Sequence, residues 1–339
     1  MVPQPSRQAA AASLRTHRSL SATLVGVIAI LGGLGAAALW AAATLCSSRS
    51  SRMIGSRVVI GWVMVVGLIV GFPFALASPG PAELTPEMMG LMFLAGVCYV
   101  AGLNLTYAAL SIGKVSVVAP IVATEGAIAA VIAVALGDTI GLAAGVMLIV
   151  IAVGVVLASL ESARPEVPVG GIDITADALE GPATADGPEA FSLTTRTPTE
   201  AETRRAAILS VSAALIFGVG LVASGKAAGL VPVAWVAVVA RFIGTVAVTL
   251  PLIAQRRFIV TRAALPLVLI AGTGEVFGSM LSAWGSRDSI AITAVLGSQF
   301  AAIAAVVAFL LFGERLSRVQ VVGVVLIGAG VTALAAATA

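Results

Sequence analysis

The chain is poor in charged residues, which make up only 10% of its 339 residues, against about 25% in an average soluble domain. Hydrophobic residues make up 59%, and the mean hydropathy is +1.10. A soluble protein of this composition could not cover its surface with polar groups. The composition therefore excludes a cytosolic enzyme and predicts an integral membrane protein, with the lipid bilayer as a partner.

Metal ligands and catalytic side chains are also scarce. Cys46 and Cys98 are the two cysteines and lie in apolar segments, while His17, the one histidine, lies near the N-terminus. The spans therefore hold no zinc-protease pattern and no Ser-His-Asp set. We expect no metal, no cofactor and no catalytic residue, and a membrane-embedded enzyme acting on lipid finds no support. Basic residues occur singly between apolar runs, so nucleic acid is not expected as a partner despite a pI near 9.3.

Ten apolar segments are long enough to cross a membrane as helices, which takes about 20 residues each. The alternation of a β-strand is absent from them, so the chain is expected to be an all-α integral membrane protein. The predicted spans are residues 23–46, 58–77, 88–110, 115–136, 141–160, 206–224, 231–254, 264–284, 290–312 and 319–337.

One acidic segment divides the apolar chain into two parts. Residues 161–205 hold nine acidic residues and four arginines, a net charge of −5, whereas the rest of the chain carries +8. Their Pro, Thr, Asp and Glu content predicts a disordered linker between the halves 23–160 and 206–339. Residues 1–22, with three arginines, are predicted to form a cationic tail.

The two halves align with each other when the chain is shifted by 176 residues. The first five spans then fall on the last five without a gap, and Gly137-Asp138 falls on Gly313-Glu314. Because five is an odd number, the second half must enter the membrane from the opposite side. The pattern predicts two inverted five-helix repeats, a plan common among secondary transporters, with the substrate site near the midplane between the halves.

Two matching segments carry a resemblance to a known family. Ala109–Ile121 leads to Leu136-Gly137-Asp138, and Ser289–Leu296 leads to Phe312-Gly313-Glu314-Arg315 and then to Gln320–Gly330. In these residues the chain resembles EamA-type members of the drug/metabolite transporter superfamily. The resemblance implies ten spans and alternating-access transport, often export, of a small organic metabolite or amino acid-like compound across the cytoplasmic membrane without ATP. The chain departs from the family in having Leu296 opposite Pro120 and a longer linker.

Three ionisable residues fall in the middle of predicted spans, where each costs about 3 kcal/mol to insert and marks a candidate functional site. Arg241 and Glu275 lie at comparable depth on consecutive helices, so we predict that they pair. The pair is either structural or part of a substrate or proton site. Glu125 has no obvious partner, and it is either a proton carrier or a neutral, hydrogen-bonded acid.

The eighth span has a polar face. Glu275, Ser279 and Ser282 follow the i, i+4, i+7 spacing of one helical face, and a shift of 176 residues places them on Tyr99, Leu103 and Thr106. A cavity lining explains this face, and so does helix packing through hydroxyl groups. The other candidate lining residues are Asn104, Tyr107, Thr124, Ser298 and Gln299.

Several residues are expected to have structural roles. Pro120 should loosen the fourth span, and Asp138 and Glu314 should complement the start of the helix that follows each of them. Trp40 lies near a span end, where anchoring at the membrane interface is expected. Glycine pairs such as Gly67 and Gly71 allow close helix approach, or alternatively a homodimer contact.

The orientation in the membrane has conflicting indications. The family resemblance places both termini in the cytoplasm, and we follow it. The inner segments then hold five basic residues and the outer loops nine, whereas the positive-inside rule favours the reverse. We expect a multi-pass secondary transporter of the cell membrane that exports a small molecule. A scaffold or sensor that does not transport is the alternative, which has no need for charges inside its spans.

Overall fold

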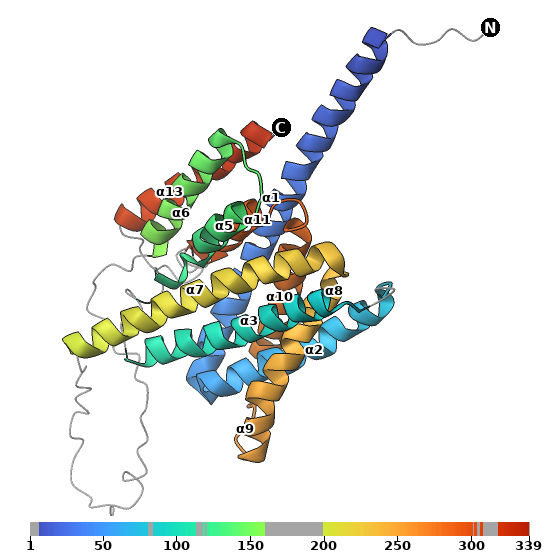
Figure 1. The fold of residues 1–339 in the computed structure, drawn as a ribbon. Coiled ribbons are helices and arrows are strands. Elements are labelled where there is room, and N and C mark those ends of the chain that lie inside the picture. The colour runs from blue at the N-terminus through green and yellow to red at the C-terminus, as the bar shows by residue number, and fades with distance from the viewer. Residues whose placement is uncertain are drawn as a thin grey trace, which may run out of the picture.

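The computed structural model describes residues 7–80, 84–112, 118, 121–159, 199–300, 302–303, 306–307 and 318–338. All regular secondary structure in these ranges is helical (Figure 1). A π-helical segment at Thr245–Thr249 joins α8 to α9, immediately before Pro251, which lacks the backbone N–H of a regular helix. The helices are α1 (Arg7–Ile54), α2 (Ser56–Ala77), α3 (Pro86–Ile112), α5 (Glu125–Ala135), α6 (Leu142–Ser159), α7 (Glu200–Leu230), α8 (Val233–Gly244), α9 (Leu250–Ala254), α10 (Leu265–Gly285), α11 (Ile290–Gly297) and α13 (Arg318–Thr338).

Six stretches of helix are long and apolar enough to cross a membrane. Four of the ten predicted spans instead fall on α5, α6, α11 and α13, which are shorter or continue into residues outside the described ranges. Pro120 and Glu314 also lie outside those ranges. The six long stretches are Val27–Ser51, Ser56–Ala77, Pro86–Ala109, Glu200–Leu230, Val233–Ala254 and Leu265–Gly285.

The first helix of each half begins earlier than its predicted span. α1 has 48 residues, a length of about 72 Å at 1.5 Å per residue, and its N-terminal part projects from the bundle (Figure 1). It begins at Arg7, inside the segment predicted as a tail. α7 begins inside the segment predicted as a linker, where Thr199 accepts a hydrogen bond from the backbone N–H of Glu202 at 3.2 Å, and the Glu202 carboxylate accepts one from the Thr199 N–H at 2.8 Å. This capping box fixes the start of the helix.

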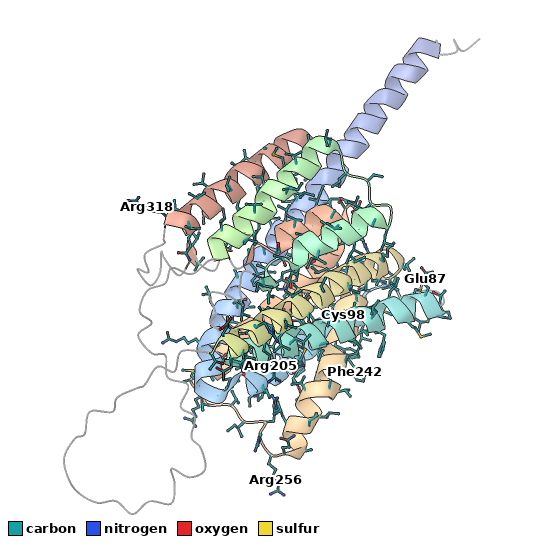
Figure 2. All side chains as sticks on the ribbon, turned by 60° about the vertical axis from the view of Figure 1, so that its left-hand side comes forward. Glu87, Cys98, Arg205, Phe242, Arg256 and Arg318 are labelled. Atoms are coloured by element: carbon teal, nitrogen blue, oxygen red, sulfur yellow. The ribbon has the colours of Figure 1, made fainter. Side chains whose placement is uncertain are left out.

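The outer surface of the bundle is apolar. Ile69 and Ile149 are each 66% exposed and Val131 is 70% exposed, as expected for side chains that face lipid. Charged side chains lie at helix ends, where Arg256 and Arg318 project from the bundle (Figure 2). The structure therefore places apolar side chains outward along the helices and charges at their ends.

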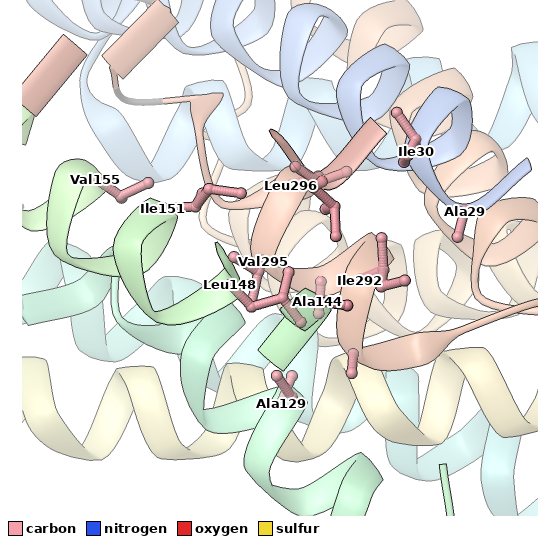
Figure 3. Close-up of a cluster of buried hydrophobic side chains, with 14 of the residues drawn as sticks. Ala29, Ile30, Ala129, Ala144, Leu148, Ile151, Val155, Ile292, Val295 and Leu296 are labelled. Carbon is pink, nitrogen blue, oxygen red and sulfur yellow. The ribbon is translucent and has the colours of Figure 1, made fainter. Parts of the chain in front are cut away.

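Helices of one half pack mainly against helices of the other. α1 packs against α10, α3 against α7, α2 against α8 and α5 against α11, and α6 lies beside α13 (Figure 1). A buried apolar cluster joins α1, α5, α6 and α11, with Ile30, Ala129, Ile151 and Leu296 among its members (Figure 3). The two halves thus share one core.

Glycines make the closest of these approaches. A β-carbon added at Gly154 of α6 would lie 2.9 Å from the Gly323 carbonyl oxygen and 3.0 Å from the Ile327 backbone nitrogen of α13. Gly67 and Gly71 lie against α8 and α10 of the same chain. This pair therefore serves close packing within the chain.

We expect the substitution Gly154→Leu to separate α6 from α13 and to destabilise the protein by about 1–3 kcal/mol or more, because it overpacks a backbone contact. Gly145→Leu on the same helix is the control, since a β-carbon there has its nearest listed-range neighbour, Ile140 Cδ1, at 3.6 Å. The measurement is the melting temperature of each purified variant. Equal melting temperatures would contradict the contact.

Candidate functional site

A cavity of about 730 Å³ lies between the two halves and is lined by residues of α1, α3, α5, α7, α8 and α10. Its lining combines three ionisable side chains with hydroxyl groups and aromatic rings. The ionisable residues are Glu125, Arg241 and Glu275; the hydroxyl groups come from Thr44, Ser47, Ser51, Ser56, Thr106, Ser224, Ser279 and Ser282; and the aromatic residues are Trp40, Tyr99, Tyr107, Phe217 and Phe300.

Arg241 and Glu275 form an ion pair in one wall of the cavity. Arg241 Nη2 lies 3.5 Å from Glu275 Oε2 and donates to the Glu275 carbonyl oxygen at 3.0 Å. The same nitrogen donates to Ser279 Oγ at 2.7 Å. The structure confirms the pairing predicted from their equal depth on consecutive helices.

Tyr99 completes the enclosure of this pair. Its hydroxyl donates to Glu275 Oε2 at 2.7 Å, and the guanidinium carbon of Arg241 lies 4.5 Å from the centre of its ring, within the range of a cation–π interaction. Arg241 is only 1% exposed, and its Nε has no hydrogen-bond partner among the described residues. The guanidinium is therefore held by the protein and presents almost no surface to the cavity.

Glu125 is the third ionisable group of the cavity and lies at the first position of α5. It is 8% exposed. Within the described ranges its carboxyl group makes no hydrogen bond and no ion pair. The unpaired N–H groups of a helix N-terminus favour a negative charge there, which makes Glu125 the one lining carboxylate without a counter-ion on the described part of the chain.

α5 and α11 are interrupted at matching positions. A turn at Ala123 and Thr124 precedes α5, and a turn at Ser298 and Gln299 follows α11. A shift of 176 residues places Ala123 on Gln299, and the two helices pack against each other. Discontinuous helices at the centre of a membrane protein are a recurring location for substrate and ion sites.

Polar contacts hold the two halves together at the end of the bundle where α7 and α10 end. Asp138 Oδ2, in the loop before α6, accepts from the backbone N–H of Ala291 at 3.0 Å and from Ser289 Oγ at 3.2 Å. Sequence reasoning assigned Asp138 to the start of α6, but its carboxylate lies at the N-terminus of α11, because the chain fold brings the other half over this loop.

Arg287 makes a second contact at the same end. Its Nε donates to the Ala228 carbonyl oxygen at 2.7 Å and its Nη2 to the Val231 carbonyl oxygen at 3.1 Å. The described cavity lining reaches Ser51 and Ser56, at the junction of α1 and α2, and takes no residue from Arg287–Ala291.

The structure brings seven of the eleven predicted site residues into this cavity: Tyr99, Tyr107, Glu125, Arg241, Glu275, Ser279 and Ser282. Asn104 is a correction, because it is exposed and its side-chain amide donates to the Val100 carbonyl oxygen of its own helix at 2.8 Å. Thr124 and Ser298 line a separate pocket of about 220 Å³ beside α6. Gln299 is 2% exposed and lines neither space.

Sequence reasoning missed the contribution of α1. Trp40 was assigned to a membrane interface, but it lines the cavity, and its ring lies 6.5 Å from that of Phe300. Thr44, Ser47 and Ser51 follow at the spacing of one helical face, so a search for polar faces in the first span would have found them. Phe217 and Phe300 carried no comparable signal, since isolated phenylalanines are common in apolar spans. Among the described residues, no group of three or more His, Cys, Asp or Glu side chains could hold a metal ion.

Comparison with known proteins identifies the first half of the chain. Fifteen chains of solved structures match. One crystal structure of a protein aligns over 92% of this chain and 96% of its own, with a TM-score of 0.62 and 16% identity, which is a likeness of fold alone. No curated protein matches. Residues 27–160 match the EamA-like transporter family. This segment, which supplies Trp40, Tyr99 and Glu125 to the cavity, is therefore an EamA-like transporter domain, consistent with the drug/metabolite transporter superfamily.

Proposed function

We propose that the chain is a secondary transporter that exports a small organic metabolite or amino acid-like compound across the cytoplasmic membrane by alternating access. The observation that carries this proposal is the cavity between the halves, which holds Glu125, Arg241 and Glu275 and has its described lining at one end of the bundle. Ionisable groups inside a membrane are costly and mark substrate or ion pathways. A scaffold has no use for such a cavity.

We also propose that the transporter consists of ten helices in two inverted five-helix repeats. The packing supports this plan, because exchanging the halves turns the α1–α10 pair into α7–α3 and the α2–α10 pair into α8–α3. Individual contacts are reciprocal as well. Gly154 lies against Ile327 and Gly330 against Ile151, and the two contacts exchange under the shift of 176 residues.

Alternating access requires the end held by Asp138 and Arg287 to open while the other end closes. Four hydrogen bonds hold this end, each worth about 0.5–3 kcal/mol, so a bound substrate could offset their loss. The halves would then exchange roles around a fixed site at the centre.

The test is release of compounds from proteoliposomes loaded with a defined mixture of amines, amino acids, sugars and organic acids. We expect at least one compound to leave about tenfold faster than from protein-free liposomes, a barrier difference of about 1.4 kcal/mol. Ser224→Trp fills the cavity from α7 and should abolish this release. Val219→Trp is the control, because Val219 lies on the same helix and is 39% exposed. Release of no compound, or equal release by both variants, would contradict the proposal.

A further inference from the structure

We infer that the cavity binds an organic amine in its protonated form, with Glu125 as the anionic partner of the ammonium group. This inference rests on the proposed transport function and names the substrate class of the same site. It separates amines from amino acids, which the proposed function leaves together.

The charge of the described lining carries the first step. It contains two carboxylates, Glu125 and Glu275, and one guanidinium, that of Arg241. The ion pair at 3.5 Å and the bond from Tyr99 at 2.7 Å already satisfy Glu275. When Glu125 is ionised, the described lining therefore carries one negative charge that the protein does not neutralise.

The position of Glu125 carries the second step. Its side chain is more than nine-tenths buried, it lines the cavity, and it makes no hydrogen bond or ion pair with any described residue. A buried carboxylate without a partner is costly, whereas the N-terminus of α5 favours its charged form. A cation that enters the cavity would supply the missing opposite charge.

The same geometry disfavours a ligand with a carboxylate. Glu125 and Glu275 lie close enough to interact electrostatically, so a third carboxylate would meet repulsion from both. Arg241 is the guanidinium of the described lining and is 1% exposed, with its Nη2 committed to Glu275 and Ser279. It is not available to the carboxylate of an amino acid.

The remaining walls suit an amine with an apolar body. Trp40, Tyr107, Phe217 and Phe300 line the cavity, and aromatic faces attract ammonium groups as well as apolar surfaces. Phe217 precedes Gly218, where an added β-carbon would lie 2.7 Å from Ile128, one turn beyond Glu125. An aromatic ring thus lies at the level of the carboxylate, in a cavity of the size that holds small ligands.

The experiment compares three probes that share a phenylethyl body: 2-phenylethylamine, phenylalanine and 2-phenylethanol. Binding to the purified full chain is measured by titration calorimetry and by the rise in melting temperature that a ligand of the native state produces. We expect the amine to bind, and the amino acid and the alcohol to bind at least about tenfold more weakly, since a bond to a charged group is worth about 1.5–3 kcal/mol.

The variants assign the effect to the carboxylate. Glu125→Gln should weaken amine binding by about tenfold or more, whereas Glu125→Asp, which keeps the charge, should bind the amine more tightly than Glu125→Gln. Glu87→Gln is the matched control, since Glu87 also lies in the first turn of a helix but is exposed (Figure 2), and it should bind as the unaltered chain does.

Three results would overturn the inference: no binding of the amine, equal amine binding by Glu125→Gln and the unaltered chain, or phenylalanine binding as tightly as the amine. If Glu125→Gln does not fold, the inference stands on Glu125→Asp, which must retain amine binding. Failure of the amine is distinguishable from failure of the transport proposal, because release of another compound from proteoliposomes would still support transport.

Discussion

Replacing Arg241 by leucine is expected to destabilise the protein by about 3–5 kcal/mol, the cost of breaking a buried ion pair by removing one partner. Arg241 is 1% exposed, and three groups would lose its guanidinium: the Glu275 carboxylate, Ser279 Oγ and the ring of Tyr99. The measurement is the melting temperature of the purified variant, together with its midpoint of chemical unfolding.

The double substitution Arg241→Leu with Glu275→Leu should recover much of this stability, because no uncompensated charge remains. Replacement of a buried pair by apolar residues is often neutral. A double variant as unstable as Arg241→Leu would contradict the pairing as the source of the loss.

The double variant also separates a structural pair from a substrate site. It removes one positive and one negative charge, so the described lining keeps the single negative charge of Glu125. We therefore expect it to bind 2-phenylethylamine within about threefold of the unaltered chain, a difference of less than 1 kcal/mol. Loss of amine binding in a stable double variant would show that the pair itself contacts the ligand.

Substituting Asp138 by alanine is expected to open the end of the bundle where the two halves meet. The change removes both hydrogen bonds that the carboxylate accepts, from Ala291 and Ser289, and the negative charge at the N-terminus of α11. Each bond to a charged group is worth about 1.5–3 kcal/mol, and 1.4 kcal/mol corresponds to a tenfold change in population. We expect at least about a tenfold gain in access to the cavity from this end.

The measurement is the rate of labelling by a membrane-impermeant thiol reagent applied from that side. Cys46 and Cys98 are both free and are replaced by alanine, and Ser282→Cys places the reporter in the cavity lining near the end of α10.

Asp288→Ala is the control for this experiment. Asp288 lies beside the same helix start, but its Oδ2 has no hydrogen-bond partner among the described residues, and partial burial raises the pKa of its carboxyl group above the usual value. Its removal should leave the labelling rate within about twofold, the small change expected where no interaction is lost. Equal rates for Asp138→Ala and Asp288→Ala would refute the role of Asp138.

Much of the architecture follows from local properties of the chain. Apolar runs of about 20 residues predict membrane helices because lipid offers no partner for backbone polar groups, and six of the predicted runs are long apolar helices in the structure. The depth of Arg241 and Glu275 within consecutive runs predicted their pairing, since neither charge is tolerable alone. The spacing of Glu275, Ser279 and Ser282 predicted a shared polar face, and all three line the cavity.

The identity of the lining depended on contacts that sequence spacing does not specify. Asn104 lies one position from Leu103 of the cavity wall, yet the rotation of α3 leaves it exposed and bonded to its own backbone. Trp40 reaches the cavity because α1 packs along α10, where Gly278 leaves room for the indole ring. Helix rotation and partner choice are set by packing of the whole bundle, which a single span does not encode.

The sequence alone therefore determined the membrane class, the two apolar halves and their shift of 176 residues, because these depend on composition and on the length and order of apolar runs. Tertiary structure decided that Tyr99 bonds to Glu275, that Arg241 is enclosed, that Asp138 holds α11 and that Glu125 faces the cavity without a described partner. Each of these joins segments far apart in the chain, and only the packing of one half against the other brings such segments within hydrogen-bond distance.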